Sequence, residues 1–162
     1  MAPLQTQLEN YVDAANCLRK SLELEDQRVI KVGLLTKIAG NYKKADDKAQ
    51  AIGASQEAVD LIRELTGAKD IQAVKCLINL AATHDHFENK DDAKRLYQEY
   101  LDMYASENGQ NGTESWAEND QYVKIKDVCE NAIAALDEAP EEEGEGAAGE
   151  EEYYDEEGDD GY

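Results

Sequence analysis

The chain has 162 residues, of which 37 are acidic and 16 are basic, so its formal net charge is −21. This length fits one domain, or one domain with a tail, and the negative charge disfavours nucleic acids and anionic membranes as partners, because both attract cationic proteins. No segment approaches the ~20 apolar residues of a membrane span, and three cysteines cannot all pair within one chain, so we expect free thiols and a cytoplasmic location.

Acidic residues concentrate at the end of the chain. Residues 139–162 contain nine Glu and three Asp, with no Lys or Arg and no Leu, Ile, Val or Phe. Such a segment cannot bury enough apolar surface to offset the entropy lost on ordering. We therefore predict an α-helical domain over residues 1–138 and a disordered acidic tail over residues 139–162.

The predicted domain reads as all-α. Its only prolines, Pro3 and Pro140, lie at or beyond its ends, and apolar residues recur between them at helical spacing and never alternate as in a strand. About six helices are expected. The first runs from Gln5 to Leu24, and the second begins near Glu25 and can run on to Ile52. The third follows a stop at Gly53, is capped by Ser55 and ends at Gly67. Asp70 caps the fourth, the fifth opens at Asn89 or Asp91, and a covering helix runs from Trp116 to Leu136.

Two of these helix pairs are similar. The segment Ile38–Tyr42 recurs loosely as Leu80–His84, 42 residues later, and the next helix in each pair opens with a small residue, Ala58 or Ala93. Small residues let paired helices approach closely, and large residues fill the gaps beside them. This pattern is typical of helical hairpins that stack to share one core.

The order of large, small and aromatic residues over residues 70–105 resembles the tetratricopeptide repeat, in the 42-residue form found in kinesin light chains. The first repeat departs from it by about seven extra residues between Tyr42 and Ala58, and neither repeat has the usual final Pro. The resemblance implies antiparallel hairpins that form a right-handed superhelix. A generic helical bundle remains the alternative.

The resemblance also implies a function, namely a non-catalytic adaptor that binds a peptide segment of a partner protein in a concave groove. Matched by position, Asn79 corresponds to an asparagine that holds peptide backbone, and kinesin light chains suggest a cytoskeletal or transport complex. The implied groove residues are Lys37, Lys44, Lys75, Ile78, Asn79 and Ala82, with Gly33, Thr36 and Gly40 beside them.

One stretch of the domain is basic. Residues 28–48 carry six cations and only two acids, Asp46 and Asp47. This stretch is either an ordinary solvated surface or a strip that attracts an acidic partner peptide or the chain's own tail.

The tail itself ends in an acidic run whose Tyr-terminated sequence resembles the tails of tubulin. Its simplest role is to keep the protein dispersed. Candidate modification sites are Tyr153, Tyr154 and Tyr162. The alternative function is that of an acidic, histone-chaperone-like protein that binds basic proteins through this tail.

No motif in the sequence indicates catalysis, a metal or a cofactor. His84 and His86 lie two residues apart, so they diverge on a helix and cannot share one metal ion. Gly-rich phosphate loops and calcium-binding loops are absent, and each cysteine lies in an apolar stripe. We expect no enzyme activity; the oligomeric state stays open, with Trp116 and the tyrosines at 97, 100 and 104 as one candidate contact.

Overall fold

The structure is a computed structural model that describes residues 4–108 and 115–138. Within these ranges the chain forms six α-helices, one short 3-10 helix and no strand, which confirms the predicted all-α fold. The predicted acidic tail lies outside the described residues. The helices are α1 (Leu4–Leu24), α2 (Arg28–Lys44), α3 (Lys48–Thr66), α4 (Ile71–His86), α5 (Lys90–Asn108) and α6 (Asp120–Glu138), with the 3-10 helix η1 (Trp116–Glu118) before α6.

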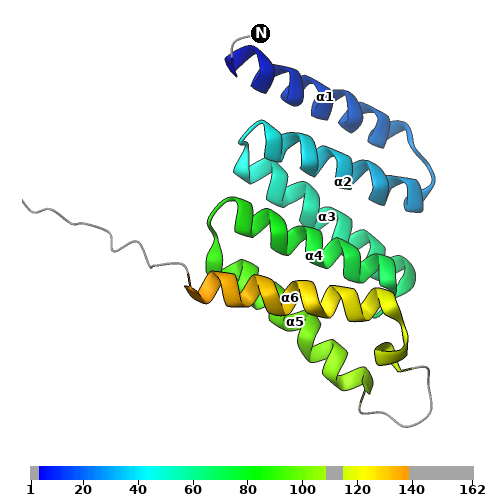
Figure 1. The fold of residues 1–162 in the computed structure, drawn as a ribbon. Helices are drawn as coiled ribbons and strands as arrows, with labels where there is room; N and C mark the ends of the chain where they lie inside the picture. Colours follow the sequence, from blue (N-terminus) through cyan, green and yellow to red (C-terminus); the bar gives the residue numbers. More distant parts are fainter. Residues whose placement is uncertain (1–3, 109–114, 139–162) are drawn as a thin grey trace, which may run out of the picture.

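The helices form a stack of antiparallel neighbours, each packed against the next along the chain (Figure 1). Backbone contacts also join α2 to α4 and α4 to α6, whereas no such contact joins α1 to α3 or α3 to α5. The helices α2, α4 and α6 therefore form one closely spaced layer, called the inner layer below. The helices α1, α3 and α5 form a wider outer layer.

The two central hairpins, α2–α3 and α4–α5, repeat with a period of 42 residues. Helices α3 and α5 have 19 residues each, and they begin at Lys48 and Lys90. The preceding turns are alike, because Asp46 and Glu88 both have a φ of 59°, in the left-handed region that non-glycine residues seldom occupy. In both turns the next amide donates a 2.9 Å hydrogen bond to a carbonyl five residues back, from Asp47 to Tyr42 and from Asn89 to His84.

This register corrects the predicted end of the second helix. Helix α2 stops at Lys44 instead of continuing to Ile52, and both Gly53 and Ser55 lie inside α3. The true N-cap is Asp47, whose carboxylate accepts a 3.1 Å hydrogen bond from the Gln50 amide. Asp46 hid the break, because an aspartate can adopt the left-handed conformation without the glycine that usually marks it.

The predicted seven-residue insertion in the first repeat is consequently wrong. Ala51, and not Ala58, occupies the position of Ala93, and both alanines have no exposed surface. Three other predicted boundaries agree with the structure: Gly67 ends α3, Asp70 caps α4 and Asn89 precedes α5. Two do not, because α2 begins at Arg28 and not at Glu25, and Trp116 belongs to η1, with α6 beginning at Asp120.

The core lies between the layers and continues under α6. Its largest fully buried side chains are Tyr100, Ile38, Leu77, Leu80, Val59, Val74 and Cys129. At the last hairpin, the Trp116 ring stacks on Tyr122 at 4.2 Å, and the Tyr100 hydroxyl donates a 2.6 Å hydrogen bond to the Tyr122 carbonyl oxygen. Helix α6 thus covers α5 as expected.

This packing bears on the oligomer contact that the sequence left open, for which Tyr104 is only partly buried. Trp116, Tyr97 and Tyr100 are buried within the chain, so they offer no surface to a second copy.

The close approach of the helices at Ala51 can be tested by replacing this alanine with a larger residue. Ala51→Leu should lower the free energy of unfolding by about 1–3 kcal/mol, because the added atoms have no space between α3 and its neighbours. Urea denaturation followed by circular dichroism would measure the loss. Ala49→Leu, on the exposed side of the same helix, is the matched control and should change stability by less than about 0.5 kcal/mol. Equal effects of the two substitutions would contradict the packing described.

Candidate partner-binding groove

A small recess opens between α2, α3 and α4. Its volume is about 60 Å³, enough for a few water molecules or a small side chain. Two of its helices belong to the inner layer, and α3 closes it from behind. The lining residues are Thr36, Ala39, Gly40 and Lys43 from α2, Ser55 and Ala58 from α3, and Cys76, Asn79 and Thr83 from α4.

Hydroxyl groups form the floor of the recess. Ser55 and Thr83 are both buried, and their hydroxyl oxygens lie 3.3 Å apart. The Thr83 hydroxyl donates to the backbone carbonyl of Asn79 at 2.8 Å, and the Thr36 hydroxyl donates to that of Val32 at 3.0 Å. These bonds satisfy the buried hydroxyls and fix their positions.

At the rim, the exposed side-chain amide of Asn79 makes no hydrogen bond within the described part of the chain. An amide offers both donors and acceptors, so this group is available to a ligand.

Gly40 keeps the α2 side of the recess open. A Cβ atom built on this residue would meet nothing within 4 Å. Gly40 therefore gives access to the hydroxyl floor and is not required by close packing. A Cβ atom built on Gly33, two turns earlier on α2, would also meet nothing within 4 Å.

Cys76 lines the recess, and its thiol is held in the neutral, protonated form. Burial raises its pKa, and a hydrogen bond with Thr36 lowers the pKa by a smaller amount. Cys129, fully buried under α6, has its pKa raised to about 12 by burial. A thiol is a poor nucleophile when protonated, so neither cysteine has the character of a reactive centre.

The predicted groove residues lie on α2 and α4, and three of them, Thr36, Gly40 and Asn79, line the recess. Lys37 and Lys75 are exposed beside it, and the Lys75 ammonium donates a 3.0 Å hydrogen bond to Gln121 of α6. The Lys44 ammonium is directed toward α1, 5.4 Å from the centre of the Tyr11 ring. Ile78 and Ala82 are partly buried on α4.

Lys43 lines the recess and was missed in the sequence. The spacing of Thr36, Gly40 and Lys43, at i, i+4 and i+7, places them on one side of a helix and could have identified it. We call Lys37, Lys43, Lys44 and Lys75 the lysine face.

The two layers differ in how many of their charged side chains form ion pairs. Arg19 pairs with Glu57 at 3.4 Å and Arg63 with Glu99 at 2.6 Å, which links α1 to α3 and α3 to α5 across the outer layer. Helix α2 contains one arginine, four lysines and no acidic residue. Arg28 pairs with Glu64 of α3 at 2.5 Å, but within the described residues none of the four lysines belongs to an ion pair. The positive charge of these lysines is therefore not neutralised locally.

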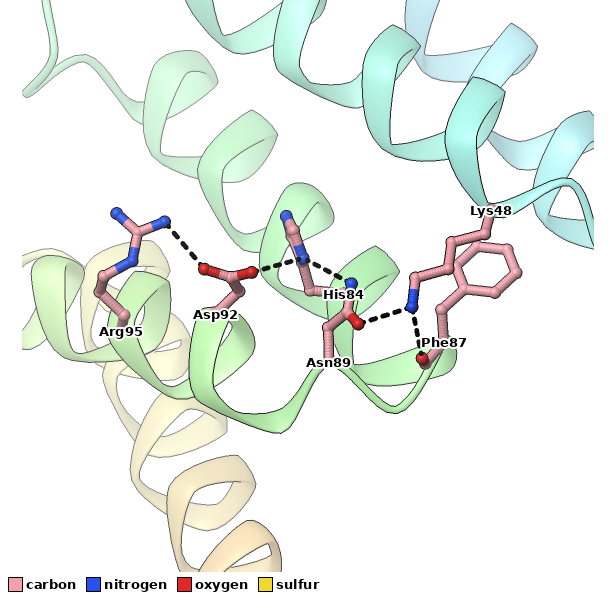
Figure 2. Close-up of polar contacts among 6 residues, drawn as sticks. All are labelled: Lys48, His84, Phe87, Asn89, Asp92 and Arg95. Atoms are coloured by element: carbon pink, nitrogen blue, oxygen red, sulfur yellow. Dashed lines mark hydrogen bonds and ion pairs between the residues drawn. The ribbon is translucent and has the colours of Figure 1, made fainter.

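A polar cluster holds the α4–α5 turn against the start of α3 (Figure 2). The Lys48 ammonium donates to the Asn89 side-chain oxygen at 2.6 Å and to the Phe87 carbonyl at 3.5 Å. The Asn89 amide nitrogen lies 3.3 Å from His84 Nδ1, and burial lowers the pKa of this histidine. His84 is therefore the packed residue of the turn that the repeat pattern predicts, and its contacts are to Asn89 and Asp92.

His86 is exposed and lies edge-on to Phe87. Among the described residues, no group of three or more His, Cys, Asp or Glu side chains could hold a metal ion. A separate search of the same residues finds no helix long and apolar enough to cross a lipid bilayer.

Two matched hairpins, a preceding helix and a covering helix define the class of stacked helical-repeat proteins. Residues 32–106 match the tetratricopeptide repeat family, and these residues contain nearly all of α2 to α5. The match supports a tetratricopeptide repeat protein, and such repeats suggest a protein–protein interaction adaptor. No curated protein and no solved structure matches the chain.

Thiol accessibility should follow this arrangement. Brief treatment of the native full chain with iodoacetamide at pH 8 should alkylate exposed Cys17 and leave buried Cys76 and Cys129 unmodified. Peptide mass spectrometry would locate the label, and the same treatment in urea should modify all three. Rapid native labelling of Cys76 would contradict the closed floor of the recess.

The open space at Gly40 predicts a gain in stability. Gly40→Ala should raise the free energy of unfolding by about 0.5–1 kcal/mol, because alanine favours a helix interior over glycine and meets no neighbour here. Gly67→Ala is the contrasting variant. Gly67 has a φ of +91°, so alanine there should be destabilising. Chemical denaturation of both variants would check the opposite signs.

Proposed function

We propose that the chain is a non-catalytic adaptor that binds an extended, acidic segment of a partner protein across α2 and α4. The observation that carries the proposal is the lysine face, whose four lysines make no ion pair with a described residue and which lies beside the recess between α2, α3 and α4. Exposed cations in such a position attract an acidic segment and set its rate of association.

The other groups of the groove suit a peptide backbone. The free Asn79 amide can donate to a peptide carbonyl and accept from a peptide amide. The recess, at about 60 Å³, accepts only a small side chain of the bound segment. In this arrangement the lysines select acidic sequence, Asn79 holds the backbone, and the recess fixes the register.

The context of this binding is part of the proposal. The resemblance of residues 70–105 to kinesin light chains suggests a cytoskeletal or transport complex in the cytoplasm. No contact in the structure bears on this context. Nucleic acids and anionic membranes are not proposed as partners, because the chain carries a net charge of −21.

Peptide selection and charge reversal test this function. Random peptides displayed on phage and selected on the full chain should enrich sequences rich in Asp and Glu. A fluorescein-labelled peptide from that selection should bind the double variant Lys37→Glu, Lys75→Glu at least about 10-fold more weakly, as measured by fluorescence anisotropy at low salt.

The matched control is Lys20→Glu, compared with the single variant Lys37→Glu, because each reverses one charge. Lys20 is also exposed, lies on α1 in the outer layer and makes no ion pair with another described residue. Its reversal should leave affinity nearly unchanged. Loss of affinity that is equal in both variants would mean that net charge, and not the lysine face, drives binding.

The second candidate function, capture of basic proteins by the acidic tail, is favoured by the 12 acidic residues that the tail carries without a cation. Histones are the available probe. Binding of histones that survives Lys37→Glu, Lys75→Glu but disappears when the tail acids are changed to amides would identify the tail as the binding element.

A further inference from the structure

We propose that the chain's own tail, residues 139–162, docks on the lysine face and competes there with the partner. The inference rests on the same face as the proposed function, but it concerns how access to that face is controlled. Its occupant is a segment of known sequence.

Charge complementarity favours this face over other surfaces of the domain. The tail has 12 acidic residues and no cation. All four arginines of the chain belong to ion pairs with acidic residues of the domain, as do Lys69 and Lys94. In contrast, Lys37, Lys43, Lys44 and Lys75 lie on two adjacent helices and have no acidic partner among the described residues. The tail can neutralise these four lysines without displacing an ion pair of the described residues.

The position of the tail's starting point makes this contact reachable. Helices α2, α4 and α6 run in the same direction, so the end of α6 at Glu138 lies at the same end of the stack as Lys43 and Lys44 (Figure 1). Two helix spacings of 8–10 Å separate α6 from α2, about 20 Å in total. A chain of 24 residues without regular structure has an r.m.s. length of about 27 Å, so Lys43 and Lys44 lie within its ordinary reach. Lys75 lies beside Gln121, about 25 Å from Glu138 along α6, so a more extended tail is needed to reach it.

Tethering strengthens such a contact. A segment attached through a short linker is present at an effective concentration in the millimolar range. A weak electrostatic contact is therefore substantially occupied at low salt, and a partner must displace the tail before it binds. A partner segment that is acidic and also contacts Asn79 and the recess would displace the tail.

Zero-length cross-linking of the full chain tests the contact directly. Carbodiimide treatment joins a lysine ammonium to a carboxylate only when the two are in contact. We expect amide bonds between the tail acids and Lys37, Lys43, Lys44 or Lys75 in 50 mM salt, and at least a fivefold loss of these products in 500 mM salt. An equal mixture of ¹⁴N- and ¹⁵N-labelled chains should give products within one isotope, because the contact is intramolecular.

The controls are Lys20 on α1 and Lys31 on α2, which make no ion pair with a described residue. Lys31 lies with Leu22 and Glu57 at a hollow between α1, α2 and α3, outside the lysine face. Tail cross-links spread evenly over these lysines and the lysine face would overturn the proposal, as would the absence of tail cross-links. Products of mixed isotope would also overturn it, because they place the tail on another molecule.

A second measurement separates this inference from the proposed function. In a full chain whose tail Asp and Glu are changed to Asn and Gln, a fluorescein-labelled peptide of residues 139–162 should bind in trans at least fivefold more tightly than to the unmodified chain. Lys37→Glu with Lys75→Glu should remove that binding. Equal binding to both chains would overturn the tail contact.

The selected partner peptide distinguishes the two possible failures. If tail cross-links form but no selected peptide binds even the amide-tailed chain, the proposed function fails and the tail contact stands. If the peptide binds both chains equally, the proposed function stands and the competition fails.

Discussion

Close contact between α3 or α5 and the neighbouring helices, at Ala51 and Ala93, is the constraint on which the other features depend. Both alanines are completely buried, and each lies three residues inside a helix that follows a turn of the same conformation. A larger residue there would separate the helices and shift the layers. The stack, the inner layer and the recess between α2 and α4 all follow from two equivalent hairpins that nest at these points.

The two layers then differ in how their charges are used. In the outer layer, ion pairs such as Arg63 with Glu99 join neighbouring hairpins, and exposed pairs of this kind contribute little stability. In the inner layer, α2 has cations without acids. The unbalanced charge is therefore concentrated on the layer whose helices lie closest together, which is where a long, thin partner can contact more than one hairpin.

Sequence reasoning predicted the all-α fold, the number of helices and most of their ends, because helical periodicity and caps such as Asp70 are local signals. It missed the α2–α3 turn because Asp46 adopts a left-handed conformation without glycine or proline. Because of that error, it assigned Ala58 instead of Ala51 as the equivalent of Ala93. It predicted a groove on α2 and α4, where the recess lies, but omitted Lys43, which lines that recess. It could not show that the Lys44 ammonium lies over the ring of Tyr11, because the two residues are far apart in the sequence.

The 42-residue equivalence of the two hairpins has a consequence for how such a molecule can change in size. The turn around Gly67 already joins one hairpin to an equivalent one, so a further hairpin added through the same connection would lengthen the stack and leave the turns at Asp46 and Glu88 unchanged. Each added module would contribute one helix to either layer. The binding surface would lengthen in increments of one helix diameter, about 10 Å, and never by a fraction of that unit.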